Sequence, residues 1–137
     1  MIVPPLVVRA GQESAVHGPL LHVLAGHVQD GRVGERGTDT SAWLAAALAP
    51  GLPLYAVSPP AALSSDPDVH GVDDLTGEAP YELLALAAAE PEEALGLLTP
   101  RGLVFVQSPG DPVAWLGHSE LAVSTLSRGA ILAVRAS

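Results

Sequence analysis

The chain contains no cysteine and no lysine, and aromatic residues make up only 4% of its 137 residues. The absence of cysteine excludes disulfides, thiolate metal sites and a cysteine nucleophile. Because aromatic side chains are so few, alanine, leucine and valine must fill the hydrophobic core. A core of such small side chains allows helices to approach a sheet closely.

Several catalytic and binding motifs are also missing. No GxSxG motif surrounds a serine, which disfavours a hydrolase triad. Neither GxGxxG nor the P-loop pattern occurs, which disfavours standard dinucleotide and nucleoside-triphosphate sites. His17, His22 and His27 are spaced around a helix, and His70 in SSDPDVHGVDD lacks a recognised ligand spacing. We therefore predict no metal site.

Positive charge is scarce. The formal net charge is −9, the six basic residues are all arginine, and none lies between Gly37 and Pro100, where acidic residues recur. A protein that binds nucleic acid needs a basic surface to displace counterions. We predict no nucleic-acid partner and interpret the acidic stretch as a solvated face.

Long hydrophobic runs are absent as well. The apolar run AWLAAALA ends at Pro50 and Gly51, well short of a membrane span. The first residues lack the basic start of a signal peptide, and Pro4 and Pro5 interrupt their apolar run. The sequence predicts a cytoplasmic protein with no membrane contact.

Apolar residues make up 48% of the chain, and its length is typical of one domain, here residues 1–137. Short apolar runs alternate with helical patterns, which favours a parallel sheet covered on both faces. We predict an α/β fold, a three-layer Rossmann-like domain with a mostly parallel sheet of about five strands. Strands are expected at 6–8, 31–35, 52–57, 103–107 and 130–134, and helices at 19–28, 40–49, 81–89, 92–98 and 119–127.

A loop and a helix end complete this prediction. Residues 58–79 are rich in proline, serine, aspartate and glycine, which is typical of an irregular acidic loop. Gly129 is expected to end the helix before the last strand.

Three segments that carry glycine follow predicted strands: AGQES, GERGTDTS and QSPGDPVAWLGHSE. In open α/β sheets, ligands bind beyond the carboxyl ends of the strands, where helix N-termini attract anions. GERGTDTS has two interpretations. Gly34 and Gly37 can allow close backbone approach while Arg36 and the amides of residues 38–41 hold an anion. Alternatively, Gly37 makes a turn and Thr38 or Asp39 caps a helix.

The stretch GERGTDTSAWLAAALAPGLPLYAVSPP resembles the GGARGADTLAAEWA stretch of the SLOG superfamily, which includes DprA-like proteins, YspA-like domains and lysine-decarboxylase-like phosphoribohydrolases. LVVRAGQES, LVFVQSPGD and GHSELAVSTLSRGAILAV resemble further family segments in the same order. Gly34-Glu35 stands at the family's double glycine. Pro109-Gly110, Gly117 and Glu120 match parts of its PGGxGTxxE motif.

This resemblance implies that a nucleotide or phosphorylated nucleoside binds at the strand carboxyl ends. If the protein is an enzyme, the implied reaction is N-glycoside (phosphoribo)hydrolysis, with Glu120 and Arg36 as catalytic residues and no added cofactor. The implied ligand-binding residues are Gly11, Gln12, Gly34, Gly37, Thr38, Ser108, Gly110 and Gly117. The alternative is a non-catalytic interaction or structural protein that retains the fold. Helix faces rich in alanine and leucine further suggest a homodimer.

Overall fold

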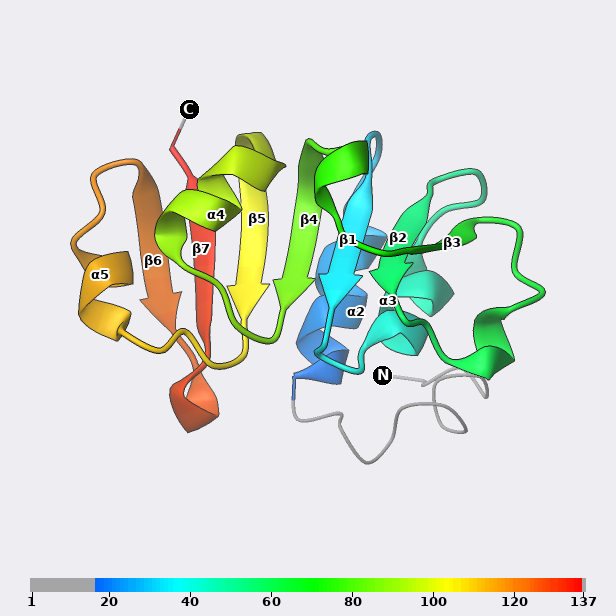
Figure 1. Cartoon of the computed structure of the whole chain (residues 1–137), viewed down its shortest axis with the longest axis horizontal. Coiled ribbons are helices and arrows are strands. Elements are labelled where there is room, and N and C mark those ends of the chain that lie inside the picture. Colours follow the sequence, from blue (N-terminus) through cyan, green and yellow to red (C-terminus); the bar gives the residue numbers. More distant parts are fainter. Residues whose placement is uncertain (1–16, 137) are drawn as a thin grey trace.

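The computed structural model describes residues 17–136, in which the strands form one seven-stranded sheet (Figure 1). The spatial order of the strands is β3-β2-β1-β4-β5-β7-β6. Their bounds are β1 Val33–Arg36, β2 Leu54–Val57, β3 Val69–Val72, β4 Tyr81–Leu86, β5 Leu98–Val106, β6 Leu121–Thr125 and β7 Ile131–Arg135.

Strands β1 to β5 pair in parallel, whereas β7 is antiparallel to both of its neighbours, β5 and β6. The reversal is made by a tight turn, η4 (Ser127–Gly129), in which Arg128 and Gly129 have φ values of 59° and 78°. The predicted α/β Rossmann-like class with a mostly parallel sheet is therefore confirmed. Two antiparallel strands extend the sheet beyond its parallel part.

Helices cover both faces of this sheet. Helices α2 (Gly18–Gly26) and α3 (Ser41–Ala47) lie on one face, and α4 (Pro91–Leu97) and α5 (Pro112–Leu116) lie on the other (Figure 1). Helices α2, α4 and α5 each carry a proline in the first turn, where a missing N–H costs little because it has no partner within the helix. This accounts for the positions at which these helices begin.

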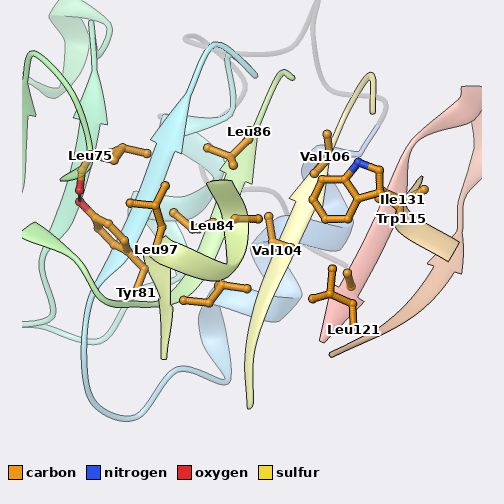
Figure 2. Close-up of a cluster of buried hydrophobic side chains, with 13 residues drawn as sticks. Leu75, Tyr81, Leu84, Leu86, Leu97, Val104, Val106, Trp115, Leu121 and Ile131 are labelled. Atoms are coloured by element: carbon orange, nitrogen blue, oxygen red, sulfur yellow. Dashed lines mark hydrogen bonds between the residues drawn. The ribbon is translucent and has the colours of Figure 1, made fainter. Parts of the chain in front are cut away.

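Strand β4 lies at the centre of the sheet and is buried on both sides, so it divides the core into two clusters. On the side of α2 and α3, the buried residues include Leu21, Ala25, Leu44, Leu83 and Phe105. On the side of α4 and α5 they include Leu84, Leu86, Leu97, Val104 and Trp115 (Figure 2). Alternate residues of β4 thus pack into the two clusters on opposite faces of the sheet, as expected for a strand.

The predicted helix at 81–89 is wrong, because Tyr81–Leu86 forms β4. This segment is leucine-rich and almost continuously apolar, a pattern shared by buried helices and central parallel strands. Its hydrogen-bonding neighbours β1 and β5 decide in favour of the strand. The helix predicted after Pro91 is confirmed as α4.

Two further expectations near the edges of the sheet are corrected. The helix predicted at 119–127 is strand β6, so Gly129 lies in a hairpin turn rather than at a helix end. Residues 58–79 contain strand β3 and two short 3₁₀ turns, η2 (Ala61–Leu63) and η3 (Thr76–Glu78). The strand predicted at 6–8 lies outside the described residues.

Tyr81 connects the sheet to the turn that precedes it. Its side chain is buried, and its hydroxyl donates a hydrogen bond to the carbonyl oxygen of Leu75 at 2.7 Å (Figure 2). Burial, followed by the nearby charge of Glu78, raises the pKa of Tyr81 to about 12. Ionisation would break the bond, because a phenolate has no proton to donate to a carbonyl.

Tyr81 predicts a loss of stability in alkali. The unfolded pKa of tyrosine is about 10, below the folded value of about 12. The contribution is therefore complete below about pH 10 and is lost as the pH rises through about 12. Denaturant unfolding should show this fall in wild type and a shallower fall in Tyr81→Phe. An equal fall in wild type and Tyr81→Phe would contradict the assignment.

Candidate functional site

The chain changes its winding direction between β1 and β4, which are adjacent in the sheet. From β1 the chain passes through α3 to β2 on one side, and from β4 it passes through α4 to β5 on the other. Such a switch point leaves a crevice between two diverging loops, and ligands of open α/β sheets bind there. Residues 37–40 and 87–90 form the two loops that leave β1 and β4.

A buried carboxylate holds the first of these loops. Glu35, the third residue of β1, is only 2% exposed. Its Oε2 accepts hydrogen bonds from the Thr38 amide at 2.8 Å and the Thr38 hydroxyl at 2.9 Å, and its Oε1 accepts one from the Ser41 hydroxyl at 2.6 Å. The Thr40 hydroxyl lies 2.7 Å from that of Thr38. One carboxylate therefore connects the strand, the loop and the start of α3.

The same loop contains two residues with left-handed backbone conformation, Gly37 with φ 77° and Asp39 with φ 62°. Gly37 is also close to the other loop, because a Cβ at this position would lie 2.9 Å from the Cβ of Ala87. Only glycine meets both conditions without strain. A non-glycine residue in this conformation, such as Asp39, is uncommon and is found disproportionately at functional sites.

Arg36 spans the two loops on the opposite face of β1. Its guanidinium donates to both carboxylate oxygens of Glu93 at 2.8 and 3.3 Å, and to the carbonyl oxygen of Ala88 at 2.8 Å. Glu93 lies in α4 and Ala88 in the loop after β4. Arg36 and Glu35 are consecutive in a strand, so their side chains point to opposite faces. Together they attach the end of β1 to a helix on each side.

Hydroxyl and carboxylate groups continue along this edge beyond β2 and β3. Val57 pairs with Val72, so Ser58 and Asp73 leave the sheet next to each other. Ser58 has a left-handed φ of 59° and is exposed, as is Asp73. Hydrogen bonds from the Thr76 hydroxyl and amide lower the pKa of the neighbouring Asp74. The carboxyl edge therefore presents acidic side chains beyond β3.

The structure brings some of the predicted site residues together. Gly37 and Thr38 follow β1, and Ser108 and Gly110 follow β5, all at the carboxyl edge. The Ser108 amide donates to the Ala87 carbonyl at 2.9 Å, which places that loop beside the one after β4. Gly11 and Gln12 lie outside the described residues.

Other predicted residues lie elsewhere. Gly34 is buried within β1, where a Cβ would lie 2.9 Å from Leu84 Cδ2, so it serves packing. Gly117 caps the end of α5. Glu120 lies at the opposite edge, because its carbonyl accepts from the Ala136 amide beyond β7, which runs antiparallel to β5. Glu120 therefore does not share a pocket with Arg36, and Arg36 is engaged in an ion pair.

Glu35, Ser58, Asp73 and Glu90 also lie along the carboxyl edge, and none of them is among the predicted site residues. Glu35 carried a usable signal, since it is the acidic residue of a short strand and three residues with hydroxyl groups, Thr38, Thr40 and Ser41, follow it closely. Asp73 could have been found only by recognising β3. Within residues 17–136, no group of three or more histidines and carboxylates is arranged to hold a metal ion, and His70 instead stacks on Tyr55.

Comparison of the fold with solved structures gives consistent neighbours. A methyltransferase from Geobacter sulfurreducens matches with a TM-score of 0.74 at 15% identity, covering 100% of this chain and 91% of its own. An O-methyltransferase from Bacillus cereus in complex with SAH matches with a TM-score of 0.67 at 16% identity, covering 98% and 92%. An SAH-bound methyltransferase from Podospora anserina matches with a TM-score of 0.64 at 12% identity, covering 97% and 88%. The chain has the fold of these methyltransferases.

No protein-family model and no curated protein matches the sequence. The structural neighbours overturn the resemblance to the SLOG superfamily, because they are methyltransferases rather than SLOG domains. The expected N-glycoside hydrolysis disagrees with these neighbours, which are methyltransferases. Two neighbours hold the small, nucleotide-like molecule SAH, which agrees with the coarser expectation of a small-molecule ligand. None of the helices in the described part of the chain could span a bilayer.

The carboxylate of Glu35 predicts a large and specific stability effect. Glu35→Gln replaces one acceptor oxygen with a donor and leaves a buried hydroxyl or amide unpaired, so the free energy of unfolding should fall by about 2 kcal/mol or more. Urea denaturation measures this change. The matched control, Glu93→Gln, alters a half-exposed ion pair and should cost less than about 1 kcal/mol. Equal effects of the two variants would show that Glu35 does not hold the loop.

Proposed function

We propose that the chain binds S-adenosylmethionine at the carboxyl edge of β1 and β4 and transfers its methyl group to a hydroxyl oxygen. The observation that carries the proposal is the loop at residues 37–40, held by Glu35 at the switch point of a sheet with a methyltransferase fold. A loop fixed before the ligand arrives loses little conformational entropy on binding.

The first loop suits the amino-acid end of this ligand, which carries a carboxylate and an ammonium group. Backbone amides at the turn into α3 supply donors for the carboxylate, and Gly37 lets the backbone come close. The exposed side chain of Asp39 supplies a negative charge for the ammonium group. This charge, which disfavours a phosphate at the same place, suits a cationic ligand.

The adenosine end needs acceptors for hydroxyl and amine protons. In Rossmann-type sites, an acidic residue about 20 positions after the first glycine binds the ribose. That position here falls at Ser58, about 20 residues after Gly37, and Ser58 carries a hydroxyl group but no carboxylate. The Asp73 carboxylate, next to Ser58 in the adjacent strand pair, supplies the missing acceptor. Ser58 and Asp73 together therefore suit adenosine.

The acceptor end of the site is formed by the loop after β4. S-adenosylmethionine, when bound, supplies an electrophilic methyl group. Residues 87–89 are all alanine and have no ionisable side chain, so Glu90 is the first acidic residue of this loop. Its carboxylate is exposed, and we assign it the role of accepting the proton of the substrate hydroxyl. The alanine side chains leave room for an apolar substrate beside it.

The binding half of the proposal predicts that SAH binds to the wild-type chain with a saturable signal in isothermal titration calorimetry. Asp73→Asn should weaken this binding about tenfold, the typical effect of losing one charged hydrogen-bond partner. Asp68→Asn is the matched control. Asp68 lies at the other end of β3 and accepts from the Gly51 amide, so its variant should bind SAH like wild type. Absence of SAH binding by wild type would overturn the proposal.

The transfer half is tested with methyl-labelled S-adenosylmethionine and a panel of small phenols and catechols. Glu90→Gln should lower kcat about 100-fold, because it removes the proton acceptor, while SAH affinity remains unchanged. Glu92→Gln is the control, since Glu92 pairs with His118 at 2.7 Å and is not assigned a role in the reaction. SAH binding with no labelled product from any acceptor would contradict methyl transfer and leave binding intact.

A further inference from the structure

A cavity of about 370 Å³ opens at the edge opposite the proposed methyltransferase site. It lies between the end of α2 and the amino ends of β4 and β5, with walls formed by Leu24, Val28, Leu83 and Leu103. Its volume falls within the range of small-molecule pockets, roughly 300–1,000 Å³. Neither the fold nor the proposed reaction assigns this cavity a role.

An irregularity in β5 brings a positive charge to the cavity. Tyr81 pairs with Leu98 and Leu83 pairs with Leu103, so β5 contains extra residues between these two pairs. Arg101 lies in this bulge with a left-handed φ of 65° and lines the cavity. Bulges of this kind redirect side chains and are frequent beside functional sites. Arg101 is also a non-glycine residue in a strained backbone conformation, and such residues occur disproportionately at functional sites.

Negative charge lines the same cavity. Glu82, at the start of β4, is held beside Gly31, whose φ is 98° and where a Cβ would lie 2.4 Å from Glu82 Cγ. Asp30 also lines the cavity and uses Oδ1 to accept from the Gly31 amide at 2.8 Å. Across residues 17–136, the side chains of Glu82 and Arg101 form no hydrogen bond or ion pair. The cavity therefore offers unpaired charges of both signs.

His27 contributes a polar imidazole ring to the cavity. Its Nδ1 lies 2.8 Å from the Val23 carbonyl, which can only accept, so Nδ1 donates this bond and, in the neutral ring, Nε2 is the acceptor. The ionisable groups that face the cavity are therefore two carboxylates, one guanidinium and one imidazole. An anion would meet an excess of negative charge, and a simple amine would leave Arg101 unused.

We infer that this cavity binds a small α-amino acid with an apolar side chain. Arg101 receives the carboxylate of the ligand, because a guanidinium can bind a carboxylate through two parallel hydrogen bonds. Glu82, supported by Asp30 and His27 Nε2, receives the ammonium group. The ligand side chain covers the apolar wall formed by Leu24, Val28, Leu83 and Leu103. This inference does not depend on methyl transfer, because the two sites lie at opposite edges of the sheet.

The experiment is a titration of the full ¹⁵N-labelled chain with L-leucine, followed by amide chemical shifts. We expect saturable shifts confined to residues around Arg101, Glu82 and His27. The analogues 4-methylpentanoate, which lacks the amine, and 3-methylbutylamine, which lacks the carboxylate, should bind at least about tenfold more weakly. Glycine, which lacks the apolar side chain, should also bind more weakly.

Two variants and one control complete the test. Arg101→Asn keeps a residue that tolerates the left-handed conformation, and Glu82→Gln keeps the shape of the side chain. Each should weaken L-leucine binding about tenfold or more. Arg128→Asn is the matched control, because Arg128 is an exposed arginine with φ 59° in the β6–β7 turn, and it should bind like wild type. No saturable shifts with L-leucine, equal binding of the analogues, or equal affinities of the Arg101 and Arg128 variants would overturn the inference.

Discussion

The arrangement of the carboxyl edge depends on the carboxylate of Glu35. A buried charge is tolerated only when its hydrogen-bonding capacity is met, and Glu35 meets it with the Thr38 amide and the hydroxyls of Thr38 and Ser41. These partners are supplied by the loop only in its folded conformation. The requirement to satisfy one carboxylate therefore determines the path of the chain from β1 into α3, and with it the shape of the crevice beside β4.

The two central strands give this loop a rigid base. Gly34 lets β1 pack against Tyr81 and Leu84, and Gly37 lets the loop after β1 approach Ala87. Arg36 then joins the loop after β4 and helix α4 to the end of β1 through Ala88 and Glu93. A site placed on this base is formed before any ligand arrives. Arg101, the unpaired positive charge at the amino-edge cavity, instead stands on a bulge in β5, an irregularity that a regular sheet would not contain.

Much of the carboxyl edge was predictable from local patterns. Gly37 and Thr38 form the turn expected before α3, and Ser108 and Gly110 follow a strand as expected. The expected cap is absent, because the N-cap residue Thr40 makes no side-chain cap hydrogen bond and the Thr38 hydroxyl bonds to Glu35 instead. Glu120 lies at the other edge because residues 121–125, predicted as part of a helix, form β6, and a strand here begins at the edge opposite to that of a helix. The resemblance to the SLOG superfamily failed for a related reason. A glycine and several hydroxyl residues after a strand are common to many α/β folds, since any such loop must turn and cap a helix.

By itself, the amino-acid sequence determined the class of the fold, the prolines that begin α2 and α4, and a turn rich in glycine and hydroxyl groups after β1. These features follow from the periodicity of side chains and from backbone constraints within a few residues. Only the tertiary structure decided that Tyr81–Leu86 is a strand, that β7 runs against β5, and that Ser58 and Asp73 leave the sheet as neighbours. The physical reason is that strand hydrogen bonds are made to other segments, so the partners, and not the strand's own residues, determine its direction and register.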